Sequence, residues 1–229
     1  MLFESLSLKH LARPPAVEGI GAPPLLIMLH GVGSNEQDLF ELAPQLDPRA
    51  YVLSLQAPYQ LAPNQYGWYH IQFMPQGHEI TPDQAEASRK KLVQFIDEAV
   101  EYYEADPKRT FLFGFSQGAI MSLALLLTEP HGLAGVIAVA GRVLPDLFRA
   151  DSPLGNKLAD TDVLTGRYLF LAHGTQDPIM PVAYGRQAEN LLARSPVQMT
   201  YREYEMGHEI NPKCLKEIQF WLESHLSGP

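Results

Sequence analysis

The sequence has little cysteine and no long hydrophobic run. Cys214 is the one cysteine among 229 residues, which excludes an internal disulfide bond and a metal site built from several cysteines. The longest apolar stretches, 119–127 and 133–140, are far shorter than the roughly 20 residues that span a bilayer. The N-terminus has Glu4 where a secretory signal would be basic, and it alternates like a surface strand. We therefore expect a cytoplasmic protein that does not insert into membranes.

Positive charge is also scarce. Lysine and arginine number 17 against 26 aspartates and glutamates, a net charge of -9. Such a surface repels phosphate backbones, so we do not expect a nucleic-acid partner. The composition, 46% hydrophobic and 19% charged, is typical of a globular protein rather than a disordered one. The length predicts a single domain over residues 1–229 and leaves open whether the chain forms a homodimer.

Short apolar runs alternate along the chain with longer amphipathic runs. Several of the short runs are apolar on both faces, as in the strands of a buried parallel sheet. The alternation predicts an α/β fold with a doubly wound, mostly parallel sheet, helices on both faces and no large cap domain. The expected strands are 25–29, 51–55, 110–115, 135–140, 168–172 and 198–204, and the expected helices are 35–46, 82–105, 117–129, 182–194 and 212–226.

The clearest helix start is the sequence Thr-Pro-Asp-Gln at residues 81–84. The threonine can cap the helix, the proline suits the first helical position, and the glutamine can reach back to the cap. Apolar residues then recur three and four positions apart at Leu92, Phe95, Ile96 and Ala99. This pattern predicts a long helix with one buried face.

Residues 57–77 are rich in proline, tyrosine and tryptophan, and they are too many for an ordinary connection. Long loops in compact domains are usually functional or disordered, and this aromatic content argues against disorder. We expect the segment to lie near the substrate, with Tyr66, Trp68, Tyr69 and Phe73 as tentative substrate-binding residues. The alternative is that these side chains only pack the loop onto the core.

A nucleophile motif occupies residues 114–118, where Gly-Phe-Ser-Gln-Gly matches G-x-S-x-G. It lies between an apolar strand and a helical run. The motif places its serine, here Ser116, on a sharp and strained turn, and glycines two residues away on either side leave room for the packed strand and helix. The alternative is a tight glycine turn with an incidental serine.

A serine nucleophile needs a histidine base and an acid that orients the histidine. Asp177 follows the apolar run 168–172 closely, so we expect it at the same edge of the sheet as Ser116. Other aspartates before that strand fall in a polar stretch and are expected to be solvated loop charges: Asp146, Asp151, Asp160 and Asp162.

The tetrapeptide Gly-His-Glu-Ile occurs twice, at 77–80 and 207–210. The chain order serine, acid, histidine selects His208 over His78 as the base. Neither copy continues as H-E-x-x-H, because a proline stands at the last position, and this excludes that type of zinc hydrolase. No metal ligand set is therefore expected. The remaining histidines are expected at the surface or behind the site: His70, His131, His173 and His225.

The tetrahedral intermediate of acyl transfer needs backbone N–H donors, an oxyanion hole. One donor is expected from Gln117, the residue after the nucleophile, and one from Val32, which follows an early strand. The glycines around Val32 also resemble the start of a dinucleotide-binding motif. However, Glu36 stands where the third glycine would be, and the next strand ends at Gln56 instead of an acid, so we expect no dinucleotide.

Taken together, the segments that contain these motifs resemble the phospholipase/carboxylesterase family of α/β-hydrolases, which includes bacterial carboxylesterases and acyl-protein thioesterases. The resemblance rests on residues 29–46, 111–127, 171–182 and 207–222. It implies Ser116 as nucleophile, Asp177 and His208 as its partners, and the Val32 and Gln117 amides as oxyanion donors. The sequence Tyr-Gly-Trp-Tyr-His at 66–70 departs from the tryptophan-phenylalanine-aspartate pattern of eukaryotic acyl-protein thioesterases, so substrate choice does not transfer.

The sequence thus predicts a serine carboxylesterase for small to medium acyl esters, with an acyl-enzyme on Ser116 and without a metal or organic cofactor. The alternative within the same chemistry is an acyl-thioesterase or lysophospholipase that acts on longer acyl chains. A non-catalytic binding protein of the same fold is disfavoured, because a site that no longer catalyses a reaction does not need the serine, its acid and base, and the oxyanion donors.

Overall fold

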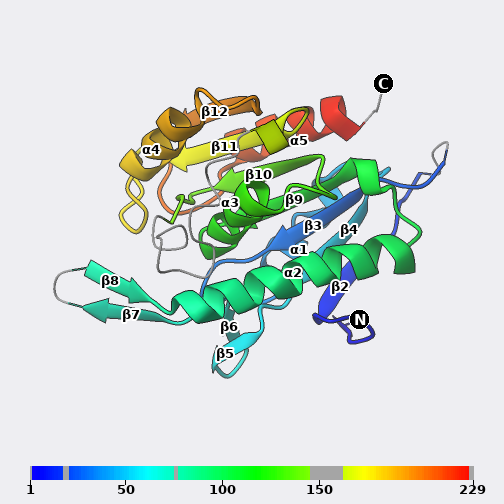
Figure 1. Cartoon of the computed structure of the whole chain (residues 1–229), viewed down its shortest axis with the longest axis horizontal. Helices are drawn as coiled ribbons and strands as arrows, with labels where there is room; N and C mark the ends of the chain where they lie inside the picture. Colours follow the sequence, from blue (N-terminus) through cyan, green and yellow to red (C-terminus); the bar gives the residue numbers. More distant parts are fainter. Residues whose placement is uncertain (1, 18–20, 75–76, 145–161, 227–229) are drawn as a thin grey trace.

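The centre of the fold is an eight-stranded sheet (Figure 1). This computed structural model describes residues 2–17, 21–74, 77–144 and 162–226, and of 72–74 and 77–79 it describes the backbone alone. The strand order is β1-β2-β4-β3-β9-β10-β11-β12, antiparallel between β1, β2 and β4 and parallel from β4 onward. The strands are β1 (Leu2–Phe3), β2 (His10–Arg13), β3 (Leu25–Leu29), β4 (Tyr51–Leu55), β9 (Thr110–Phe115), β10 (Gly135–Val139), β11 (Tyr168–Gly174) and β12 (Gln198–Tyr204).

Helices cover both faces of the sheet, which confirms the doubly wound arrangement (Figure 1). One face packs against α2 (Pro82–Tyr102), α3 (Gln117–Thr128) and α4 (Ala183–Leu192). The other face packs against α1 (Gln37–Phe40), the 3₁₀ turn Ala43–Gln45 and α5 (Pro212–Leu226). The central strands β3 and β10 are buried along their whole length, as expected of strands that are apolar on both faces. A further 3₁₀ turn, Pro107–Arg109, leads into β9.

The helix expected over 35–46 is much shorter than predicted. It ends at Phe40, and a separate 3₁₀ turn follows at Ala43–Gln45. Pro44 lies within this 3₁₀ turn and has no N–H for a continuing helix, and a proline ring also clashes with the preceding turn of an α-helix. The chain can therefore bend here and enter β4.

The start of α2 is where the sequence predicted it, but the expected reciprocal cap is absent. The Thr81 side chain makes no capping hydrogen bond. The side-chain oxygen of Gln84 instead accepts a hydrogen bond from the His70 backbone N–H at 2.9 Å. Gln84 thus joins the helix to the preceding segment rather than to its own N-cap.

The long segment 57–77 contains regular structure that the sequence did not predict. One small hairpin, β5 (Tyr59–Ala62) with β6 (Gln65–Gly67), lies within it, and a second, β7 (Ile71–Met74) with β8 (Gly77–Ile80), starts in it and ends at Ile80. Their short strands lack the alternation of apolar and polar residues that marks a half-buried strand, so the sequence pattern predicted only a loop. The β7–β8 hairpin projects beyond the body of the protein beside α2 (Figure 1).

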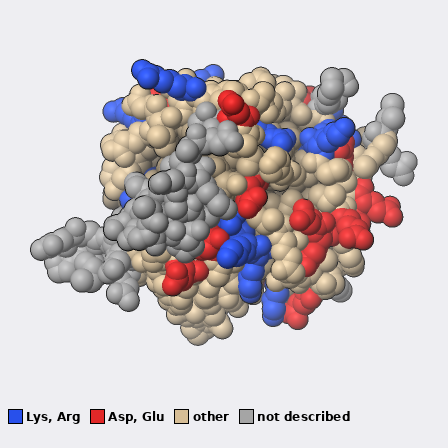
Figure 2. Space-filling view, in the orientation of Figure 1, with Lys and Arg blue, Asp and Glu red and all other residues tan. Residues whose placement is uncertain are grey.

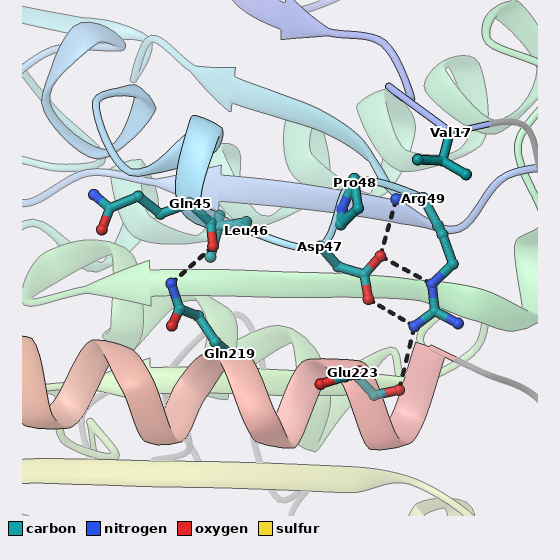
Figure 3. Close-up of a pocket in the computed structure, with 8 residues that line it drawn as sticks. All are labelled: Val17, Gln45, Leu46, Asp47, Pro48, Arg49, Gln219 and Glu223. Carbon is teal, nitrogen blue, oxygen red and sulfur yellow. Dashed lines mark hydrogen bonds and ion pairs between the residues drawn. The ribbon is translucent and has the colours of Figure 1, made fainter.

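A surface cavity of about 460 Å³ lies beside residues 45–49, which lead into the amino end of β4 (Figure 3). The Gln219 amide of α5 donates a hydrogen bond to the Gln45 carbonyl at 2.7 Å. The Arg49 guanidinium donates to the Asp47 carboxylate at 2.6 Å. Burial alone would raise the pKa of Asp47, but the hydrogen bonds from Arg49 hold it below its usual value. The Gln219 contact and a hydrogen bond from Arg49 to the Glu223 carbonyl join α5 to the segment that enters β4.

Charged side chains of both signs are interspersed on the face in Figure 2, and the described residues of this face form no continuous basic patch. In the parts of the chain that the structure describes, no helix is long and apolar enough to cross a membrane. The expectation that nucleic acid is not a partner stays a prediction.

Candidate active site

The three residues expected to act together all lie beyond the carboxyl ends of parallel strands. Ser116 directly follows β9, Asp177 follows β11, and His208 follows β12. Carboxyl ends of parallel strands meet at one edge of a sheet, and ligands of open α/β sheets bind outside this edge. β3, which precedes Val32, pairs with β9 and brings the expected oxyanion segment to the same place.

The backbone at Ser116 is strained, as the motif predicts. Its φ and ψ are 53° and -116°, a combination that residues with side chains rarely adopt. A Cβ at Gly114 would lie 2.4 Å from the Gly118 carbonyl oxygen, and a Cβ at Gly118 would lie 1.9 Å from the Leu29 oxygen. Only glycine fits at both positions. The absence of side chains lets α3 start directly against the end of β3 and presents Ser116 at the tip of the turn.

Hydrogen bonds connect the three side chains in one chain of contacts. The His208 Nε2 lies 2.9 Å from the Ser116 Oγ, and its Nδ1 lies 2.7 Å from the Asp177 Oδ2. A carboxylate only accepts, so Nδ1 carries the proton and Nε2 is free to accept the serine hydroxyl proton. The Asp177 side chain is fully buried, whereas 19% of the His208 side chain is exposed. The geometry is that of a serine nucleophile with its base and acid.

The acid is held by backbone contacts. The second carboxylate oxygen of Asp177, Oδ1, accepts hydrogen bonds from the backbone N–H groups of Ile179 and Met180, at 2.9 and 2.8 Å. The Met180 carbonyl in turn accepts a hydrogen bond from Nε2 of His173 at 2.6 Å. His173 is completely buried, and this burial lowers the pKa of its ring, so the ring is neutral near pH 7. The sequence predicted His173 at the surface or behind the site. It did not predict the hydrogen bond from His173 to Met180, whose backbone N–H holds Asp177.

The expected oxyanion donors lie on either side of the serine. Gly31 packs so closely that a Cβ on it would lie 3.3 Å from the Ser116 Cβ, which brings the following Val32 amide beside the nucleophile. Gln117 is the first residue of α3, a position whose N–H has no acceptor within the helix. That both amides donate to the oxygen that develops charge at the serine stays a prediction.

Two of the four residues of the long loop that were expected to bind substrate are buried. Trp68 is 0% exposed and Tyr69 is 1% exposed, and burial raises the pKa of the Tyr69 hydroxyl. Neither side chain presents surface to a substrate, so their position favours the alternative that they pack the loop onto the core. Tyr66 is half-buried, and the side chain of Phe73 lies outside the described residues. Aromatic content alone does not indicate which face of a loop is buried, and a role of Trp68 and Tyr69 in substrate binding stays a prediction that their burial disfavours.

A cavity of about 310 Å³ adjoins His208. Its walls carry the apolar side chains Leu39, Leu42, Phe115 and Ile210, and the carboxylates Asp38, Glu41 and Glu209. Phe115 also packs against the His208 ring, with 4.9 Å between the ring centroids. The cavity offers apolar surface within reach of the reacting groups. Within the described part of the chain, no group of three or more histidine, cysteine, aspartate or glutamate side chains could hold a metal ion.

Comparisons with known proteins identify the family of the chain. The model of the phospholipase/carboxylesterase family matches residues 19–226. Esterase YpfH of Escherichia coli is 30% identical over 219 residues, 89% of this chain and 85% of that protein. Acyl-protein thioesterase 1 of Kluyveromyces lactis is 28% identical over 181 residues, 74% of this chain and 76% of that protein. The structure of the Bacillus cereus carboxylesterase matches with a TM-score of 0.77 and 26% identity, covering 95% of this chain and 94% of the other. The chain therefore belongs to the phospholipase/carboxylesterase family of hydrolases with the α/β-hydrolase fold.

Proposed function

We propose that this protein is a serine carboxylesterase that hydrolyses small to medium acyl esters through an acyl-enzyme on Ser116. The observation that carries the proposal is the chain of hydrogen bonds from the Ser116 Oγ through His208 to Asp177, at 2.9 and 2.7 Å. A serine hydroxyl is a weak nucleophile near neutral pH unless a base in this position takes its proton.

The reaction has two similar halves. Ser116 Oγ attacks the ester carbonyl carbon while its proton moves to His208 Nε2, and the amides of Val32 and Gln117 donate to the oxygen that becomes negatively charged. The bond to the leaving alcohol then breaks, and His208 returns the proton to the alcohol oxygen. Water repeats the attack on the acyl-enzyme and releases the acid. Asp177 keeps the His208 ring in the correct tautomer and stabilises its positive charge.

The size of the cavity beside His208 supports a short or medium acyl group. At about 310 Å³ it is at the lower end of the range, roughly 300–1,000 Å³, of typical small-molecule sites. The name of the Kluyveromyces lactis relative, an acyl-protein thioesterase, supports the alternative of a thioester substrate. The single cysteine supports a reducing compartment, and on this basis we also propose a cytoplasmic location.

A panel of esters and thioesters, from acetyl to palmitoyl with one leaving group in each series, tests the proposal. We expect kcat/KM to be highest for butyryl to octanoyl esters and lower for the matched thioesters. A fluorophosphonate probe should label Ser116. A preference for palmitoyl thioesters would replace the proposal with the thioesterase alternative, and a failure of the probe to label the protein would exclude a serine hydrolase.

Asp177→Asn should lower kcat by about 10⁴, by analogy with other serine triads. The Asn oxygen is expected to stay with the backbone N–H groups of Ile179 and Met180, since these groups only donate. Its NH₂ group then faces His208 Nδ1, which must accept, and the ring proton moves to Nε2, where it can no longer take the proton of Ser116. Steady-state kinetics on a butyryl ester measures the loss. A decrease of less than tenfold would assign the acid role to another carboxylate.

A further inference from the structure

Trp68 connects the two segments that carry the proposed oxyanion donors. Its backbone N–H donates a hydrogen bond to the side-chain oxygen of Gln117 at 2.7 Å. Its indole N–H donates to the backbone carbonyl of His30 at 3.0 Å. The side chain is completely buried, so both contacts are shielded from water. One residue of the long loop therefore contacts α3 on one side and His30, directly after β3, on the other.

The contact with His30 is one of several between the long loop and the oxyanion segment. The Gly33 N–H donates to the Tyr66 carbonyl, and the Tyr66 N–H donates to the Ser34 carbonyl, both at 2.8 Å. The Ala57 N–H donates to Nε2 of the buried His30 ring at 3.1 Å. The loop thus makes four hydrogen bonds with the oxyanion segment, residues 30–34.

The hydrogen bonds of His30 determine the orientation of the Val32 amide. Because the Ala57 N–H can only donate, Nε2 of His30 carries no proton, and the ring proton is on Nδ1. Nδ1–H then donates to the Gly31 carbonyl at 2.7 Å. The peptide bond between Gly31 and Val32 is trans, so its N–H points away from its carbonyl. With the Gly31 carbonyl held by His30, the Val32 N–H lies in the same peptide plane and must point in the opposite direction.

Two hydrogen bonds hold the Gln117 side chain on the long loop. Its oxygen accepts from the Trp68 N–H, and its NH₂ group donates to the Tyr69 carbonyl at 2.9 Å. The residue is 2% exposed. These two bonds connect the first residue of α3 to two consecutive residues of the loop, and they restrict the movement of the Gln117 backbone N–H relative to the Val32 N–H.

We infer that Trp68 is a positioning residue for the oxyanion hole and does not form a wall of the acyl site. The inference rests on the proposed function. Hydrogen-bond donors stabilise a transition state only if they are already oriented toward the oxygen that becomes charged, and a misplacement of about 1 Å can cost about 10²-fold in rate. The bridge through Trp68 holds the two donor segments at a constant separation.

Trp68→Phe removes the indole N–H and keeps an aromatic ring. We expect kcat to fall by roughly 10- to 100-fold with KM little changed, because the oxyanion donors stabilise the transition state more than the bound substrate. The affinity for a trifluoromethyl ketone, which forms a tetrahedral adduct with the serine, should fall by the same factor as kcat/KM. The dependence of kcat/KM on acyl length should keep its shape.

Trp221→Phe is the matched control. Trp221 is the other tryptophan of the chain, and it packs against Phe111 and Phe170 in the core on the α5 side. This variant should lower the melting temperature and leave kcat and ketone affinity unchanged. Equal losses of kcat in both variants would indicate a general effect of destabilisation and overturn the inference. A change in acyl-length preference in Trp68→Phe would show that Trp68 does form a wall of the acyl site, and would also overturn the inference.

Ser88→Ala keeps the inference testable if Trp68→Phe does not fold. The Ser88 hydroxyl donates to the Trp68 carbonyl from α2. Its removal should lower kcat and ketone affinity together by a few-fold. An unchanged kcat in this variant, or in a folded Trp68→Phe, would overturn the inference. Labelling of Ser116 by the fluorophosphonate and turnover by the unmodified protein test the proposed function separately, so the two failures are distinguishable.

Discussion

Ser116→Ala should reduce the turnover of a butyryl ester by about 10⁶, if the three residues act as a unit. The variant loses the attacking oxygen and with it the hydrogen bond of 2.9 Å to His208. Alanine keeps the Cβ that serine already places on the strained backbone at φ 53°, so the turn needs no rearrangement. We therefore expect the melting temperature and the circular dichroism spectrum to change little.

Ser122→Ala is a matched control for this variant. Ser122 is also buried, and it lies on α3 only six residues after Ser116. Its hydroxyl donates to the carbonyl of Gly118 at 2.9 Å, a contact within the helix. This variant should retain turnover close to that of the unmodified protein. Turnover by Ser116→Ala within tenfold of the unmodified protein would exclude Ser116 as the nucleophile.

His208→Ala should lower kcat as far as Ser116→Ala does, and the double variant should lose no more than either single one. Without the ring, the hydroxyl of Ser116 has no base at 2.9 Å, and Asp177 loses the group that it orients. The small space left by the ring also makes rescue testable, since added imidazole should restore part of the activity. Kinetics at saturating ester, with and without imidazole, measures both effects.

The second copy of Gly-His-Glu-Ile provides the internal control. His78 belongs to β8, which pairs with β7 in a separate two-stranded sheet and is not one of the parallel strands that precede the three residues of the candidate site. His78→Ala should therefore turn over esters at a nearly normal rate. The opposite outcome, loss of activity in His78→Ala and retention in His208→Ala, would show that chain order selected the wrong histidine.

Much of the sheet was predictable, because buried parallel strands are continuous apolar runs. The runs at 25–29, 51–55 and 110–115 are strands with the expected bounds. The helix over 35–46 was overextended, since an amphipathic pattern continued past Pro44, where the backbone cannot. The cap at Thr81 failed for another reason. Gln84 found a partner in the preceding segment, and a local pattern contains no information on such competition.

The sequence by itself determined which three side chains meet at the candidate site. A strand, a sharp glycine turn and a helix require Ser116 at the sheet edge, and the order of the later strands brings Asp177 and His208 there. These are local patterns combined with one topology rule. The hydrogen-bonding distances of 2.9 and 2.7 Å agree with that expectation.

The tertiary structure alone decided the roles of the long loop and of the buried histidines. Trp68 contacts His30 and Gln117, residues 38 and 49 positions away in the chain. His30 and His173 are buried among backbone groups of other segments, which no spacing in the sequence indicates. An aromatic ring or a neutral imidazole gains similar free energy on many buried surfaces, and the particular surface is selected by packing between distant segments. The local sequence could therefore indicate that the loop is ordered, but not that its largest side chain donates a hydrogen bond to the His30 carbonyl.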